Sequence, residues 1–246
     1  MFDRIAGVYD LMNTAMTAGL HHRWRARAAE EARVGPGDRV LDVATGTGDL
    51  ALELARRVSP GGEVVGSDFA EAMLARARTK ASSASPAGVR PRFEWGDALE
   101  LSYSDASFAA ATVGFGARNF ADLARGLAEM TRVVRPGGRV VVLEITTPTR
   151  PPLSLFYRVW FDRAVPVLGL LAGAIASLTA RVRGRTAETT IADAYTYLPN
   201  SVKRFPAPQA LAGEMERAGL EEVRYVILAG GIVAIHAGTV PAGAQG

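Results

Sequence analysis

The chain has no cysteine and only three histidines among its 246 residues. The absence of cysteine excludes disulfides, thiolate nucleophiles and cysteine-ligated metals, and makes a reducing compartment the simplest expectation. Three histidines are too few for a histidine-rich metal site. We therefore expect a cytoplasmic protein that works without a metal ion.

Long runs of a single charge are also absent. The chain has 28 basic and 25 acidic residues, a net charge of +3, spread along its length. This balance allows weak attraction to anionic lipid but does not imply a nucleic-acid partner. The N-terminal sequence holds Asp3 and Asp10 and lacks the apolar core of a signal peptide.

No uncharged apolar run is long enough to cross a bilayer. The most apolar stretch, Leu153–Ala176, is interrupted by charged residues and by Pro166, and its uncharged remainder, Ala164–Ala176, falls short of the roughly 20 residues required. Apolar side chains with flanking arginines suit docking at a membrane surface. A buried helical lid or a homodimer contact explains the same composition, so these interpretations stay open.

Strands and helices are predicted to alternate through the first 145 residues. This order is typical of an α/β protein with a parallel, doubly wound sheet. The predicted strands are Arg39–Ala44, Glu63–Gly66, Phe93–Trp95, Phe108–Val113 and Arg139–Ile145, and the predicted helices are Asp49–Val58, Ala70–Ala81 and Leu123–Val134.

The alternation stops after the fifth strand. A helix over Gln209–Ala218 is followed by two β-prone runs, Glu222–Leu228 and Gly231–His236, which predict a hairpin at one edge of the sheet. We expect a single domain with five parts: N-terminal cap helices (1–33), a cofactor-binding core (34–147), a cap and acceptor insertion (148–206), the last helix and hairpin (207–238), and a tail (239–246).

A glycine-rich turn follows the first predicted strand, in the pattern Asp42-x-Ala44-x-Gly46-x-Gly48. Glycines let the backbone approach a ligand, and the next helix offers free N–H groups. The pattern also satisfies a loose dinucleotide-binding motif, and a turn without any ligand is a third interpretation.

Two carboxylates near this turn bear on a nucleotide cofactor, but only Asp42 distinguishes S-adenosyl-L-methionine from a dinucleotide. Asp68 lies 68 − 46 = 22 residues after Gly46 and, with either cofactor, would accept hydrogen bonds from ribose hydroxyls. Asp42 precedes the turn, where it would repel a pyrophosphate but attract a sulfonium cation or an amino group. Together with the closing hairpin, Asp42 favours S-adenosyl-L-methionine and a methyltransferase over a dehydrogenase.

Two further strand ends carry polar residues. Asp97 and Ala98 follow the third strand, at the sheet edge where ligands collect, although Asp97 also fits a simple turn. The fourth strand ends in a run, Gly114–Asn119, that includes Arg118. This arginine is a candidate for stabilising an oxyanion or orienting a water molecule, with a surface ion pair as the alternative.

At these residues the chain resembles a known family, the ubiquinone/menaquinone biosynthesis C-methyltransferases, above all the members that act on demethylmenaquinone. The glycine turn marks only the superfamily, whereas the patterns FGxRN, YLPxSVxxFP and GGIxAIHxG are specific to the family. The matching stretches are MFDRIAGVYDLMN (1–13), HHRWR (21–25), VLDVATGTGDLAL (40–52), GSDFAEAML (66–74), VGFGARN (113–119), RVVRPGGRVVVLEI (132–145), YTYLPNSVKRFP (195–206) and GGIVAIHAG (230–238).

The resemblance implies a Rossmann-like class I methyltransferase fold, with a seven-stranded, mostly parallel sheet, a C-terminal antiparallel hairpin and a helical cap. It implies transfer of a methyl group to a ring carbon of a lipophilic prenylated quinol, namely demethylmenaquinol or also the benzoquinol of the ubiquinone pathway. Because such an acceptor resides in the bilayer, peripheral contact with the inner face of the cytoplasmic membrane is expected.

The resemblance also implies a set of site residues. The expected cofactor residues are Asp42, Ala44, Gly46, Thr47, Gly48, Asp68, Phe69, Met73, Asp97, Ala98 and Gly114, and the expected catalytic residues are Arg118, Asn119, His236 and Tyr195. For His236 a buried core histidine is the alternative, and for Tyr195 packing of the cap.

The cap keeps two other functions open. The stretch from Ala174 to about Ile191 is extra relative to the family, and it lies in the part expected to shape the acceptor pocket. A methyltransferase of the same fold that acts on another aromatic or polyketide-like acceptor is therefore an alternative. A non-catalytic cofactor-binding module is a second, which Asp68 and Arg118 argue against.

Overall fold

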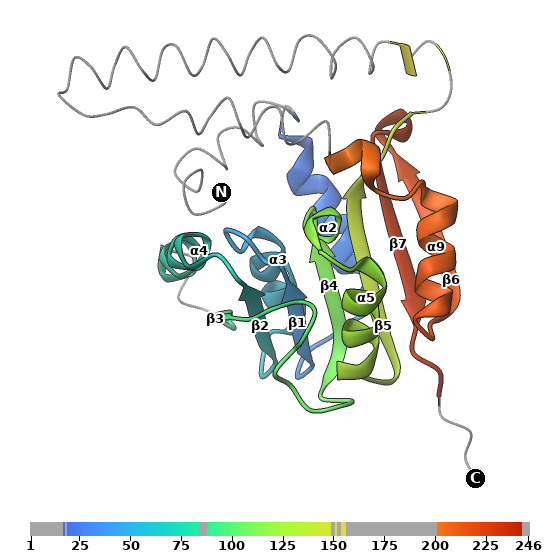
Figure 1. The fold of residues 1–246 in the computed structure, drawn as a ribbon. Coiled ribbons are helices and arrows are strands. Elements are labelled where there is room, and N and C mark those ends of the chain that lie inside the picture. The colour runs from blue at the N-terminus through green and yellow to red at the C-terminus, as the bar shows by residue number, and fades with distance from the viewer. Residues whose placement is uncertain are drawn as a thin grey trace, which may run out of the picture.

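The computed structural model describes residues 17, 19–83, 88–148, 151, 154–155 and 201–242. Its centre is a seven-stranded sheet in the order β3-β2-β1-β4-β5-β7-β6 (Figure 1). The strands are β1 (Arg39–Val43), β2 (Glu63–Asp68), β3 (Arg92–Trp95), β4 (Phe108–Gly114), β5 (Val134–Ile145), β6 (Glu221–Leu228) and β7 (Val233–Thr239).

The first five strands are parallel, and β7 is antiparallel to both of its neighbours, β5 and β6. The predicted seven-stranded, mostly parallel sheet with a C-terminal hairpin is therefore confirmed. The central strands are apolar on both sides because helices cover both faces of the sheet.

The helices divide between the two faces of the sheet. Apolar residues of α2 (Leu20–Glu31), α3 (Asp49–Val58) and α4 (Glu71–Ser83) join one core cluster. Apolar residues of α5 (Leu123–Val133) and α9 (Pro208–Arg217) join a second cluster, and these two helices lie in front of the sheet in Figure 1. Alternate residues of one strand serve opposite clusters, as with Val141 and Val142 of β5.

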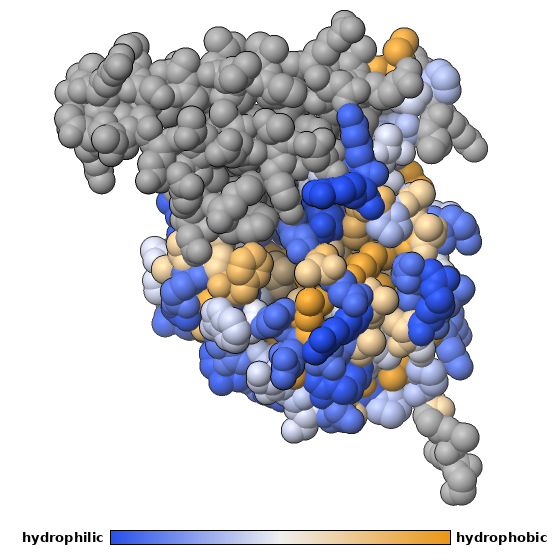
Figure 2. Space-filling model, in the orientation of Figure 1, coloured by the Kyte–Doolittle hydropathy of each residue, from blue (hydrophilic) through white to orange (hydrophobic). Residues whose placement is uncertain are grey.

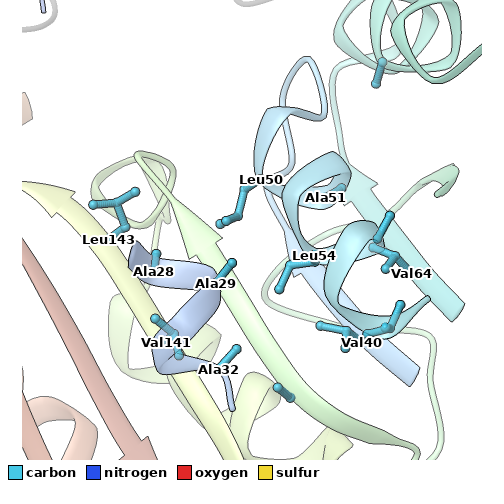
Figure 3. Close-up of a cluster of buried hydrophobic side chains, with 14 of the residues drawn as sticks. Ala28, Ala29, Ala32, Val40, Leu50, Ala51, Leu54, Val64, Val141 and Leu143 are labelled. Carbon is cyan, nitrogen blue, oxygen red and sulfur yellow. The ribbon is translucent and has the colours of Figure 1, made fainter. Parts of the chain in front are cut away.

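The first cluster packs closely because α2 presents small side chains to the sheet. Ala28, Ala29 and Ala32 lie opposite Val141 and Leu143 of β5 (Figure 3). Alanines at this helical spacing let the α2 backbone approach the strands, which fixes the helix beside the carboxyl end of β4. The N-terminal helix thereby reaches the edge of the sheet where a ligand would bind.

One predicted boundary is wrong. We predicted a helix that ends at Val134 and a fifth strand that begins at Arg139, but β5 already begins at Val134. Val134 pairs with Phe108 and Arg139 pairs with Ala110, so the four intervening residues bulge out of the ladder. Pairing across the sheet, which local sequence does not reveal, extends the strand through the glycines.

Described residues on the face seen in Figure 2 are mostly hydrophilic, with smaller apolar patches between them. Within the described ranges, no helix combines the length and the apolar character needed to cross a membrane. Most of Leu153–Ala176, where we predicted membrane docking, lies outside those ranges.

Candidate active site

The glycine-rich turn joins β1 to α3 and bends back on itself through three left-handed residues, Ala44, Gly46 and Gly48, with φ values of 49°, 56° and 84°. Gly48 is the N-cap of α3, and a Cβ there would lie 2.7 Å from the Phe93 ring. A Cβ on Gly46 would instead meet no atom within 4 Å. The backbone at Gly46 thus borders open space that a ligand can enter.

A pocket of about 330 Å³ opens at this turn, at the carboxyl ends of β1, β2 and β4. Every predicted cofactor residue except Gly48 lines it, and so does Asn119. Gly48 belongs to the turn as the N-cap of α3 but does not line the pocket. The residues lining the pocket include Asp42, Ala44, Gly46, Thr47, Asp68, Phe69, Met73, Asp97, Ala98, Gly114 and Asn119.

Asp68 connects the turn to the end of β2. One carboxylate oxygen accepts a hydrogen bond from the Gly46 amide at 2.8 Å, and the other accepts from the Ala70 amide at 2.9 Å. A carboxylate oxygen has two lone pairs, so one backbone hydrogen bond does not exhaust the acceptor capacity of either oxygen. Asp68 therefore fixes the turn, and it is the kind of group that can accept from two vicinal hydroxyls.

Asp42 lies deeper and is almost fully buried. Its two oxygens accept hydrogen bonds from the hydroxyls of Thr45 at 2.6 Å and Thr112 at 2.8 Å. Burial raises the pKa of Asp42 to about 6, although both hydroxyls and Arg25 lower it. The carboxylate is thus held in place and stays mostly ionised at neutral pH.

Arg25 of α2 reaches the pocket from outside the sheet. Its guanidinium contacts His21, lies 3.5 Å from an Asp49 oxygen and stands 5.5 Å from the centre of the Phe115 ring. Lys80 also donates to Asp49, at 2.7 Å. Burial opposes ionisation of Asp49, but Arg25 and Lys80 outweigh it and hold the pKa of Asp49 below its ordinary value.

The charges in the lining are predominantly negative. Among the described residues, the charged side chains that line the pocket are one arginine, Arg25, and four aspartates, at positions 42, 49, 68 and 97. Such a lining disfavours a pyrophosphate and favours a ligand that carries positive charge. This agrees with the preference for a sulfonium cofactor that Asp42 and the closing hairpin indicated.

Aromatic side chains border the pocket near Asp68. Phe69 is 55% exposed and Trp95, the last residue of β3, is 64% exposed, although both are large and apolar. Exposed aromatic faces beside a pocket are available for stacking on a planar ring. Asp97 lies nearby, where one of its oxygens accepts from the Leu99 amide at 2.9 Å. The predicted turn role of Asp97 is therefore present together with its place in the lining.

The catalytic role predicted for Arg118 is not supported by its position. Arg118 does not line the pocket, and its side chain is 8% exposed. Its Nη1 donates to Glu144 at 2.7 Å and to the Phe115 carbonyl. The Arg118 backbone N–H also donates to Glu144, at 3.2 Å. The surface ion pair that we weighed is instead a buried one, which ties the Gly114–Asn119 loop to the end of β5.

The catalytic role predicted for His236 is likewise not supported. His236 is buried in β7 and does not line the pocket. Its Nε2 lies 2.9 Å from the Pro208 carbonyl, and its ring stacks on Tyr225. Burial lowers the pKa of His236 to about 4, so it is a neutral core residue that joins β7 to the start of α9. Tyr195 lies outside the described residues.

Several residues that line the pocket were not among the predicted site residues, and they include Arg25, Asp49, Trp95 and Phe115. Asp49 and Phe115 adjoin predicted site residues, and Trp95 ends a predicted strand. Their positions in the sequence could therefore have indicated that they lie near the site. For Arg25 the sequence signal was its place in the family-like stretch HHRWR (21–25), which does not indicate a contact with the pocket. Its arrival depends on the packing of α2 against the sheet, which is a tertiary feature.

The residues present fit an S-adenosylmethionine molecule. The turn leaves open space at Gly46, Asp68 offers acceptors for hydroxyls, and the aspartates favour a cation. Asp42 and Asp49 would oppose a dinucleotide's pyrophosphate.

Comparison with known proteins agrees with this geometry. The model of the ubiE/COQ5 methyltransferase family matches residues 1–240. Demethylmenaquinone methyltransferase from Thermus thermophilus is 47% identical over 242 residues, which cover 98% of this chain and 100% of that protein. Ubiquinone/menaquinone biosynthesis C-methyltransferase UbiE from a Geobacter species is 38% identical over 239 residues, which cover 97% of this chain and 94% of that protein.

A solved structure shares the fold at low sequence identity. A SAM dependent methyltransferase from Aquifex aeolicus superposes with a TM-score of 0.59 at 17% identity, covering 88% of this chain and 89% of that one. The chain therefore belongs to the ubiE/COQ5 methyltransferase family, with S-adenosylmethionine as its methyl donor.

Proposed function

We propose that this enzyme methylates a ring carbon of demethylmenaquinol to give menaquinol. The observation that carries the proposal is the 47% identity to a relative named demethylmenaquinone methyltransferase, over 98% of this chain and the full length of that relative. The benzoquinol of the ubiquinone pathway is a second candidate acceptor, because a relative at 38% identity is named for both pathways.

The pocket residues divide between the parts of the methyl donor. Asp68 would accept from the ribose hydroxyls, while Phe69, Ala98 and Asp97 would hold the adenine. Asp42 would attract the positively charged end, and Arg25 would bind the carboxylate of the methionine part. The chemistry that the cofactor supplies is an electrophilic methyl group on a sulfonium.

The protein's own contribution is to align and shield the acceptor. The Gly114–Asn119 loop borders the pocket, and Gly116 is tightly fitted, since a Cβ there would lie 2.7 Å from the Ala44 side chain. Arg118 and Glu144 hold this loop in one conformation, and we assign them positioning roles. Fixing the loop keeps the ring carbon aligned and excludes water during transfer.

Ionisation of a quinol hydroxyl raises the electron density at the reacting carbon, so a group near the acceptor must take up a proton. Asn119 is the predicted catalytic residue that lines the pocket, and an amide can orient a hydroxyl but cannot serve as a base. Tyr195 stays a candidate from the cap.

The test is incubation of the full chain with isotope-labelled S-adenosylmethionine and three separate acceptors: demethylmenaquinol, the benzoquinol precursor and a hydroxyaromatic without a prenyl tail. Label in the menaquinol product supports the proposal, and additional label in the benzoquinol assigns both pathways. Transfer to the tail-less aromatic alone would favour the alternative acceptor class. Transfer to none, with the cofactor bound, would favour a non-catalytic module.

We further propose that the enzyme meets its acceptor at the membrane surface through Leu153–Ala176. Support comes from the composition of this segment, which is apolar with interspersed arginines, and from the lipophilic tail of the proposed acceptor. A homodimer contact or a buried lid formed by the same segment predicts no lipid binding, so a vesicle assay separates these alternatives.

A further inference from the structure

A second pocket lies at the opposite edge of the sheet from the cofactor pocket. Its volume is about 320 Å³, and its polar lining comes from Arg33, Asp38, Arg135, Arg139, Glu222 and Thr239. Arg139 and Thr239 are paired across β5 and β7, at the end of β7 that runs down to the lower edge in Figure 1. The methyl-transfer chemistry takes place at the other end of these strands.

Arg139 is the most unusual residue of this pocket. Arg139 is only 4% exposed. Its Nε and Nη2 atoms are buried and have no hydrogen-bond partner among the described residues. It also forms no ion pair with a described carboxylate. A buried guanidinium without a counter-charge is strongly unfavourable, so native proteins normally supply a partner.

The other charges around the pocket do not supply this partner. Arg135 is paired with Asp38 at 3.0 Å, and Arg224 lies 3.7 Å from Glu31. Burial lowers the pKa of Arg139, and Arg33 and Arg224 lower it further, while Glu31 and Glu222 act in the opposite direction. With the Arg135–Asp38 pair neutralised, the lining still holds two arginines, at positions 33 and 139, against one carboxylate, Glu222.

The chemistry of the guanidinium group indicates the class of ligand. Its N–H donors form parallel pairs that match two oxygens of one oxyanion. A tetrahedral phosphate has further oxygens left for a second arginine and a hydroxyl, and Arg33 and Thr239 line the same pocket. We propose that this pocket binds a phosphate-type oxyanion, held by the guanidinium of Arg139.

The first test is calorimetric titration of the full-length protein with inorganic phosphate, at constant ionic strength with chloride as the reference anion. We expect saturable binding of one phosphate per chain. Arg139→Gln should weaken it about tenfold or more, because a charged bidentate contact is lost. Arg139→Lys keeps the charge but not the fork and should fall between the two. Arg56→Gln is the matched control, since Arg56 is exposed and paired with Glu53 on α3.

Arg33→Gln is a second variant that tests the pocket even if the Arg139 variants fold poorly, because Arg33 is exposed and its replacement should not disturb the core. It should also weaken phosphate binding. Sedimentation with phosphatidylglycerol vesicles distinguishes a lipid headgroup from a free phosphate: binding to vesicles that depends on Arg139 assigns the phosphate to a lipid. The proposal is overturned if the wild type binds neither phosphate nor these vesicles, or if Arg139→Gln and Arg33→Gln bind as the wild type does.

Discussion

Replacing Glu144 with glutamine removes one charge from the buried pair that holds the Gly114–Asn119 loop. The side chains of Arg118 and Glu144 are 8% and 2% exposed. The carboxylate accepts hydrogen bonds from Arg118 Nη1 at 2.7 Å, from the Arg118 backbone N–H at 3.2 Å and from the Ile145 N–H at 2.8 Å. Glutamine has nearly the same shape, so the substitution changes charge with little change in packing.

The expected loss of stability is large. Glutamine leaves the Arg118 guanidinium buried without its counter-charge, which costs about 3–5 kcal/mol in comparable buried pairs. This is a substantial fraction of the roughly 5–15 kcal/mol that stabilises a typical domain. The double substitution Arg118→Met/Glu144→Leu should cost less than Glu144→Gln, because no buried charge is left unpaired.

Urea unfolding followed by circular dichroism measures these differences. Glu214→Gln is the matched control, since Glu214 pairs with Arg217 at the surface, where the Arg217 side chain is 68% exposed. It should change the free energy of unfolding by less than about 1 kcal/mol. If Glu144→Gln costs no more than this control, or if the double variant is less stable than Glu144→Gln, the buried pair does not have the role assigned to it.

Three further predictions address other parts of the molecule. His236 has a folded-state pKa of about 4, below its ordinary value of 6.5, so the unfolded chain takes up the proton first as pH falls. This residue should therefore remove about 3 kcal/mol of stability between pH 7 and pH 4. The raised pKa of Asp42 changes stability in the opposite direction over this window, so the wild type must be compared with His236→Gln, which isolates the histidine effect. Identical pH dependence of the two unfolding free energies would refute the prediction for His236. Leu170→Glu/Leu171→Glu should abolish flotation of the protein with anionic liposomes, whereas equal flotation would disprove membrane docking by this segment. Tyr195→Phe should lower the rate of methyl transfer while leaving cofactor affinity unchanged, and an unchanged rate would remove Tyr195 from the candidates for the catalytic base.

The fold was predictable from the sequence because its signals are local. The helix predicted over Asp49–Val58 has the observed bounds, since a left-handed Gly48 begins it and Pro60 follows its end. Glycine and proline act on their own neighbourhood, so they can be read without a structure. The start of β5 was not predictable, because Val134 joins the strand by pairing with Phe108.

The roles of single polar residues were harder to predict than the pocket itself. The turn, Asp68 and Asp97 follow strand ends, and parallel strands bring such ends together in any doubly wound sheet. Arg118 also follows a strand end, but its partner Glu144 lies on another strand, and only the tertiary fold shows that they meet. The same holds for His236, whose contact with Pro208 spans two separate elements.

The pocket's affinity for S-adenosylmethionine is most directly measured by calorimetry on the wild type, Asp68→Asn and Asp68→Ala, with NAD as the competing cofactor. We predict binding of one S-adenosylmethionine per chain by the wild type and no detectable binding of NAD. Affinity should fall at least about tenfold in Asp68→Ala and less in Asp68→Asn, which keeps one oxygen acceptor. Equal affinity in all three proteins, or binding of NAD in preference to S-adenosylmethionine, would contradict the assignment of this pocket.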